Sequence, residues 1–154
     1  MSYSPRSKTS NSVVVDANIT AGAVIPIDGL EGAKILFDRW AEAGRPLFAP
    51  AWWLSEVVSV IRQYVYLQKL SPARAHDAID DILSLEVEAI SLDFDLYHHA
   101  LDWAEKMNHS KVYDALYLAL AESLGAEFWT ADRRLVESAR LAGASWVHWI
   151  GNYS

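Results

Sequence analysis

Short runs of β-branched and aromatic residues alternate along the chain with longer stretches in which apolar residues recur at helical spacing. Short, unbroken apolar runs are typical of strands that are covered on both faces of a parallel sheet. A spacing of three and four residues indicates helices with one buried face. We expect strands at residues 13–15, 46–50, 87–92, 127–130 and 146–149. We expect helices at residues 17–25, 31–43, 52–70, 71–85, 93–107, 111–124 and 132–141.

The order of these elements predicts an α/β fold, with a parallel sheet, right-handed crossovers and helices on both faces. Signals at the helix ends support this interpretation. Ser71 followed by Pro72 is a favoured start of a helix, and Gly125 is a favoured C-terminal cap. The stretch that ends at Gly125 is apolar almost throughout, so we predict a helix that is buried on most sides.

The composition adds boundaries to this picture. The 154 residues include seven Trp, seven Tyr and four Phe, which is enough apolar material for one buried core. Residues 1–12 are polar, and we expect a disordered N-terminal extension followed by a single domain over residues 13–154. No stretch approaches the ~18 consecutive apolar residues of a membrane span, and no cysteine is present. These features favour a cytoplasmic protein without a membrane partner.

The formal net charge of −7 limits how the chain could recognise nucleic acid. An acidic chain does not attract phosphates by its overall field, and a simple phosphate-binding module would show a basic patch. A nuclease that contacts phosphate through a bound cation is not excluded. The question is therefore whether the sequence can gather a cluster of carboxylates.

Two acids follow predicted strands, where open α/β sheets place their ligand sites. Asp16 closes the first strand, and Asp132 comes two residues after Thr130, the end of the fourth. Either position suits a carboxylate that binds a metal ion. Helix N-capping, for which Asp is a preferred residue, explains Asp16 equally well and explains Asp132 better, because a clear helix follows it.

Two further acids lie in predicted helices. Glu56 is at the edge of an apolar stripe, where it could also reach solvent or pair with Arg62. Asp114 is the one acid in the first turns of the apolar helix, and we expect it to face protein. The helix dipole offers it only ~0.3–1 kcal/mol, which is less than the cost of burying an unpaired carboxylate. A bound cation would offset that cost.

Taken together, the four carboxylates would repel one another unless a cation neutralised them. Oxygen ligands without any cysteine favour Mg²⁺ or Mn²⁺ over zinc. The four carboxylates Asp16, Glu56, Asp114 and Asp132 together therefore favour a site for one of these ions.

These segments resemble the PIN-domain family, and most closely its VapC-type toxin ribonucleases. The resemblance rests on residues 14–18, on the helix with Glu56, and on residues 113–135, where it is most specific. It implies a three-layer PIN-like fold, with a five-stranded parallel sheet flanked by helices. The family's four acids, which bind its metal ions and are its catalytic residues, correspond to Asp16, Glu56, Asp114 and Asp132. Asn18 and Thr130 match the polar residues that hold these carboxylates or water.

The resemblance further implies a ribonuclease that hydrolyses RNA phosphodiester bonds with Mg²⁺ or Mn²⁺. Such a protein would be the toxin of a toxin–antitoxin pair, inhibited by a small antitoxin protein, and would form a homodimer. Arg133, Arg134 and Lys111 lie near the predicted site in the sequence and could contact RNA phosphates. Solvated helix ends explain these three cations equally well.

Two other functions are compatible with parts of the sequence. Residues 16–20 resemble the Asp-x-Asp-x-Thr opening of the haloacid-dehalogenase-like phosphatases, but Asn18 replaces the second Asp and the late Gly-Asp pair is missing. A non-catalytic PIN-fold module that binds RNA or protein is the other alternative. The complete set of four acids argues against it, and loss of Mn²⁺ binding on Asp114→Asn would discriminate between the two.

Overall fold

A computed structural model describes residues 11–153 of the chain, so the first ten residues of the expected N-terminal extension lie outside the described part. The strands are β1 (Val13–Val15), β2 (Leu47–Pro50), β3 (Val87–Ile90), β4 (Glu127–Thr130) and β5 (Val147–Trp149). The helices are α1 (Ala17–Val24), α2 (Ala33–Glu42), α3 (Trp53–Tyr66), α4 (Pro72–Ser84), α5 (Phe94–Lys106), α6 (Tyr113–Leu124) and α7 (Arg133–Leu141). A short 3-10 helix, η1 (Ile150–Asn152), follows β5. The predicted order of strands and helices is confirmed.

The five strands form one parallel sheet in the order β3-β2-β1-β4-β5. The chain builds the β2 side of β1 first and then crosses to the other side to lay down β4 and β5. The strand order therefore reverses between β1 and β4, which pair directly. In open α/β sheets, ligands bind outside the carboxyl ends of the strands at such a reversal.

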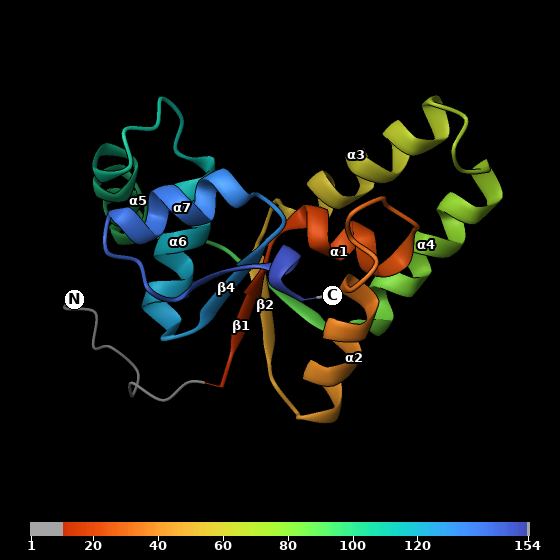
Figure 1. Cartoon of the computed structure of the whole chain (residues 1–154), viewed down its shortest axis with the longest axis horizontal. Helices are drawn as coiled ribbons and strands as arrows, with labels where there is room; N and C mark the ends of the chain where they lie inside the picture. The colour runs from red at the N-terminus through yellow and green to blue at the C-terminus, as the bar shows by residue number, and fades with distance from the viewer. Residues whose placement is uncertain (1–10, 154) are drawn as a thin grey trace.

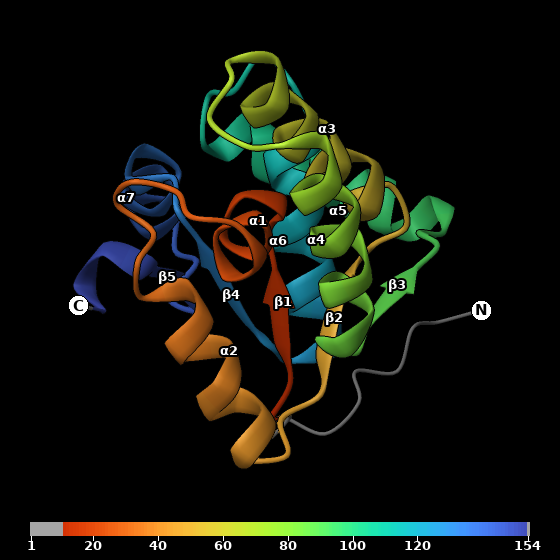
Figure 2. The same ribbon diagram turned by 90° about the vertical axis from the view of Figure 1, so that its right-hand side faces the viewer.

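Helices cover both faces of the sheet, as Figure 1 shows with α1, α2 and α4 on one side and α5, α6 and α7 on the other. The period of two along β1 separates the two cores. Val13 and Val15 pack in the core with residues of α1 to α4, whereas Val14 packs in the core with residues of α5 to α7. Figure 2 looks onto the first of these layers. The three-layer fold is thereby confirmed.

Helix α6 is buried on most of its surface, as its apolar sequence predicts. Every residue from Ala115 to Ala121 is buried. The helix ends where Gly125 adopts a left-handed conformation with φ 61°, which glycine reaches without the steric cost that a Cβ imposes. A rigid α6 fixes the side chains of its first turn at the carboxyl edge of the sheet.

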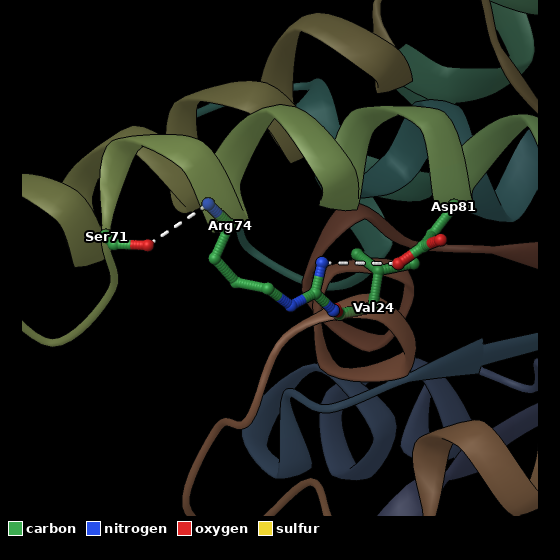
Figure 3. A network of polar contacts seen from close by, with 4 residues as sticks. All are labelled: Val24, Ser71, Arg74 and Asp81. Carbon is green, nitrogen blue, oxygen red and sulfur yellow. Dashed lines mark hydrogen bonds and ion pairs between the residues drawn. The ribbon is translucent and has the colours of Figure 1, made fainter.

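Helix α4 is fastened to the end of α1 by a polar network (Figure 3). The Arg74 guanidinium donates to the carbonyl oxygen of Val24 at 2.6 Å and to Oδ2 of Asp81 at 3.3 Å. The hydroxyl of Ser71 accepts from the backbone N–H of Arg74 at 3.1 Å, as its predicted capping role requires. The contact joins a cation to the carbonyl end of α1, where the helix dipole favours positive charge.

The largest differences from the sequence-based prediction are one helix end and one short helix. The helix expected over residues 52–70 ends at Tyr66, because Gln68 adopts a left-handed conformation with φ 58° that stops the helix without a glycine. The turn η1 was not predicted. None of the described helices is long and apolar enough to span a membrane.

Candidate active site

A pocket of about 320 Å³ opens at the carboxyl edge of the sheet, where β1 and β4 end side by side. All four acids that the sequence singles out line it, although they come from four separate segments of the chain. Asp16 follows β1, Glu56 lies in the first turn of α3, Asp114 lies in the first turn of α6, and Asp132 caps α7. The remaining lining residues are Ala17, Asn18, Ser59, Val60, Gln63, Tyr117, Phe128, Thr130 and Leu135.

Asp16 is buried, with 8% of its surface exposed, and both its carboxylate oxygens accept hydrogen bonds. Oδ1 accepts from the backbone N–H of Ile19 at 2.8 Å and so caps α1. Oδ2 accepts from the hydroxyl of Thr130 and from the backbone N–H of Ala131 at 3.3 Å. The cap and the site are therefore the same carboxylate, held between the ends of β1 and β4.

Burial raises the pKa of Asp16 from its ordinary 3.8 to about 6, because the charged form loses its hydration. The three hydrogen bonds from Ile19, Thr130 and Ala131 act in the opposite direction, and the nearby charge of Asp114 raises the pKa further. The charged carboxylate is thus costly here, and a cation in the pocket would stabilise it.

A buried hydroxyl connects Asp16 to α3. Thr20 donates to the backbone carbonyl of Asp16 at 2.7 Å, and its hydroxyl accepts from the indole N–H of Trp53 at 3.0 Å. Thr20 and Trp53 are both buried. This chain of hydrogen bonds fixes the start of α3, which carries Glu56, relative to the end of β1.

Asp132 also combines a cap with a place in the pocket. Its Oδ1 accepts from the backbone N–H of Leu135 at 3.1 Å, at the start of α7. Its own backbone N–H donates to the hydroxyl of Thr130 at 3.1 Å, and that hydroxyl donates in turn to Asp16. Thr130 therefore links the two acids that follow β1 and β4.

Asp114 is exposed, and the expectation that it faces protein was wrong. The apolar residues of α6 turn toward the sheet from Ala115 onward, whereas the first turn projects beyond the carboxyl edge into the pocket. The pKa of Asp114 is nonetheless raised, first by partial loss of hydration and then by the charge of Asp132, while His109 lowers it. Two pairs of acids, Asp16 with Asp114 and Asp114 with Asp132, thus repel each other across the pocket.

Glu56 is exposed and contacts α6 rather than a basic neighbour. The hydroxyl of Tyr117 donates to its Oε1 at 2.9 Å. Arg62, the partner considered from the sequence, instead lies over the ring of Tyr66 at 6.0 Å. Glu56 therefore reaches the pocket through an interaction with α6 that the sequence did not reveal.

The family model of the PIN domain matches residues 13–141, which include all four pocket acids. The chain belongs to the PIN domain family. PIN domains are generally nucleases and typically use divalent metal ions.

The crystal structure of PAE2754 from Pyrobaculum aerophilum has a similar fold, with a TM-score of 0.62 and 21% sequence identity. The similarity covers 84% of this chain and 80% of that one. No curated protein matches the chain. At this level of identity the similarity shows a shared fold.

The donors of the pocket suit the ions that PIN domains use. All four acids offer oxygen ligands, which Mg²⁺ and Mn²⁺ prefer. The pKa values of Asp16 and Asp114 are raised, first by loss of hydration and then by a neighbouring carboxylate. Among residues 11–153, however, no three acidic or histidine side chains already lie close enough to hold an ion. Asp114 and Asp132 are exposed, so their side chains can rotate toward a cation without repacking the core.

The three cations considered as RNA contacts do not line this pocket of the PIN domain. Arg133 pairs with Glu137 at 2.9 Å and lies over the ring of Trp149. Arg134 is exposed on α7, and Lys111 lines a separate hollow beside Tyr113. A contact of these three cations with RNA stays a prediction.

Several pocket residues were not identified from the sequence. Ser59 and Gln63 follow Glu56 by three and seven residues on α3, so helical spacing from Glu56 could have found them. Tyr117 follows Asp114 by three residues, but it is indistinguishable from a core residue in an apolar run. Thr20 lies outside the pocket lining, and its contacts could not be found from the sequence, because its two partners are a backbone carbonyl and a distant indole.

Proposed function

We propose that this PIN domain is a divalent-metal-dependent ribonuclease that hydrolyses RNA phosphodiester bonds. The observation that carries the proposal is the convergence of four carboxylates from distant segments on one pocket at the reversal of strand order. Carboxylates repel one another, so their gathering is costly to the fold unless it serves a cation. Metal-assisted hydrolysis is the chemistry that such a donor set supports.

Asp16, Glu56, Asp114 and Asp132 would hold the cation, Mg²⁺ or Mn²⁺. When bound, such an ion neutralises the carboxylates, polarises a phosphate and makes water a better nucleophile. Asn18 lines the same pocket with an exposed amide, which is suited to orient water or phosphate.

The hydrogen bonds already present decide which atoms remain for a cation. A carboxylate has about four acceptor positions, and Asp16 uses two on Oδ2 and one on Oδ1. Its open position is therefore on Oδ1. Asp132 uses Oδ1 for Leu135 and, among the described residues, leaves Oδ2 without a hydrogen bond. Thr130 fixes the positions of Asp16 and Asp132 relative to each other, as a supporting group around a metal site should.

The proposal extends to the biological role implied by the VapC-type resemblance. We infer a toxin ribonuclease that is inhibited by an antitoxin protein and that acts as a homodimer. The net charge of −7 and the absence of Lys or Arg among the described residues that line the pocket favour phosphate contact through a cation rather than through basic side chains. Neither a phosphatase of the haloacid-dehalogenase type nor a non-catalytic module is favoured by the family match or by the complete acid set.

The test is cleavage of a mixed RNA pool in Mn²⁺ by wild type, Asp16→Asn and Asp80→Asn, all purified identically. Asp80 is an exposed acid of α4 outside the pocket and serves as the matched control. Cleavage by wild type and Asp80→Asn alone, stopped by a chelator, would support the proposal. Equal cleavage by Asp16→Asn would assign the activity to a contaminant. Absence of cleavage by all three would make the interaction module the leading function.

A further inference from the structure

The ring of Tyr117 packs against two other aromatic rings. It stacks on Phe128 of β4 with a centroid distance of 5.4 Å and an interplanar angle of 18°, and it meets Trp52 edge-on at 6.3 Å and 86°. The residue is buried, with 4% of its surface exposed. Because the ring cannot tilt without displacing these neighbours, the position of its hydroxyl at the pocket is fixed.

The partner of this hydroxyl is the opposite kind of side chain. Glu56 is exposed at the start of α3, and a glutamate there has three side-chain torsions to restrict. Within residues 11–153, its carboxylate has a single hydrogen-bond partner, the hydroxyl of Tyr117 at 2.9 Å, and no ion-pair partner. The rigid side chain therefore holds the flexible one.

The hydrogen bond engages only one oxygen of the Glu56 carboxylate. The hydroxyl donates to Oε1, and no side chain among the described residues contacts Oε2 through a hydrogen bond. A phenol is protonated at neutral pH, so the Tyr117 hydroxyl is the donor and the Glu56 carboxylate is the acceptor of this bond.

We propose that Tyr117 is a positioning residue that holds the Glu56 carboxylate in the pocket, ready to contact a divalent cation. The inference rests on the proposed metal-dependent function and adds a residue to it. Tyr117 and Asp114 lie one helical turn apart on α6. In this arrangement α6 supplies one acid directly and, through Tyr117, orients a second acid that belongs to the helical layer on the other face of the sheet.

Direct Mn²⁺ binding, measured by calorimetry and by electron paramagnetic resonance without RNA, tests this role. The proteins are wild type, Tyr117→Phe, Glu56→Ala and the double variant. Phenylalanine keeps the stacked ring and removes only the hydroxyl, so the fold should persist, which thermal unfolding checks. Tyr113→Phe is the matched control, because Tyr113 is an exposed tyrosine of the same helix outside the pocket lining.

We expect Tyr117→Phe to weaken Mn²⁺ binding roughly tenfold, the lower end of the effect of supporting groups around metal ligands. Tyr113→Phe should bind as wild type does. In the Glu56→Ala background, Tyr117→Phe should change the Mn²⁺ Kd less than about twofold, because the carboxylate through which it acts is gone.

Two results would overturn the role of Tyr117. One is unchanged Mn²⁺ affinity in Tyr117→Phe despite a weakened Glu56→Ala. The other is an equal loss in both backgrounds, which would show an effect on packing instead. Asp16→Asn distinguishes a failure of the role of Tyr117 from a failure of the proposed function. If wild type binds no Mn²⁺, or Asp16→Asn binds it equally, the metal site itself is wrong and the role of Tyr117 falls with it.

Discussion

At the scale of single residues, the pocket contains a buried carboxylate, a group that proteins usually leave exposed to water. Asp16 is among the few buried polar residues of the described chain, and it is held as an anion by three donors while desolvation opposes that charge. Groups with perturbed pKa values that sit in a cleft are frequent at functional sites. The cost should therefore be measurable in the stability of the metal-free protein.

Replacing Asp16 with Asn should stabilise the metal-free protein at high pH. The folded carboxyl ionises near pH 6 and the unfolded one near 3.8, so ionisation costs the fold about 3 kcal/mol above pH 6 and nothing below 3.8. Asn removes that cost but places an amide near the N–H of Ala131. We expect a net gain of up to about 2 kcal/mol at pH 8, because an unsatisfied donor costs about 1–3 kcal/mol.

Urea unfolding in a chelator from pH 4 to pH 8 would measure the difference between Asp16→Asn and wild type. The advantage of the variant should grow as pH rises through 4 to 6 and then level off. Asp80→Asn, at an exposed position, should show no such growth. An advantage for Asp16→Asn that is largest at pH 4 would contradict the assigned pKa shift.

Thr130 offers a second test at this scale, because its hydroxyl donates to Asp16 and accepts from the N–H of Asp132. Thr130→Val keeps the shape and removes the hydroxyl, so the pKa of Asp16 should rise further. Mn²⁺ binding should weaken roughly 10–100-fold. The lowest pH at which Mn²⁺ still binds should rise. Calorimetric titrations at pH 6 and pH 8 would show a larger loss at pH 6; an equal loss at both would exclude a role through Asp16.

At the scale of helices and strands, the predictions succeed where a local pattern carries the information. The apolar run of β4, the cap at Ser71 and the glycine after α6 all mark boundaries that the structure confirms. The end of α3 was missed because Gln68 takes a left-handed conformation that its residue type does not announce. The exposure of Asp114 was missed because it depends on how far α6 projects past the sheet, and periodicity contains no such information.

Arg74 holds α4 against the end of α1 through two contacts, one with the Val24 carbonyl and one with Asp81, and two substitutions test them separately. Arg74→Ala removes a charged donor from the carbonyl of Val24 and also its packed stem, so it should destabilise the fold by about 1.5–3 kcal/mol. Asp81→Ala removes only an exposed ion pair and should cost less than about 1 kcal/mol. Chemical denaturation of both variants would compare them, and equal losses would refute the dominant role of the Val24 contact.

At the scale of the whole molecule, the site is a product of topology. Asp16 and Asp132 are far apart in sequence but adjacent in space, because β1 and β4 pair where the strand order reverses. The alternation of elements predicts the parallel sheet, and the resemblance to the PIN family predicts which acids converge. The strand order and the contact between Tyr117 and Glu56 depend on packing between distant segments, which one sequence without its structure does not specify.

The same topology concentrates negative charge in a protein that already carries −7, so a divalent cation should stabilise the whole fold and not the pocket alone. A ligand at 100 times its Kd adds about 2.7 kcal/mol to the stability of the folded state. For a domain of this size that corresponds to a rise in Tm of roughly 5–10 °C. Mn²⁺ should produce this rise in wild type and in Asp80→Asn, but not in Asp16→Asn.

Sodium chloride at matched ionic strength separates binding from screening. Screening acts on all surface charges and should move the Tm of the three proteins by similar, smaller amounts. Scanning calorimetry in a chelator, in Mn²⁺ and in the matched salt would therefore distinguish a bound ion from general neutralisation. An equal rise with Mn²⁺ in wild type and Asp16→Asn would mean that the ion acts on the acidic surface as a whole, and the convergence of the four acids would then need another explanation.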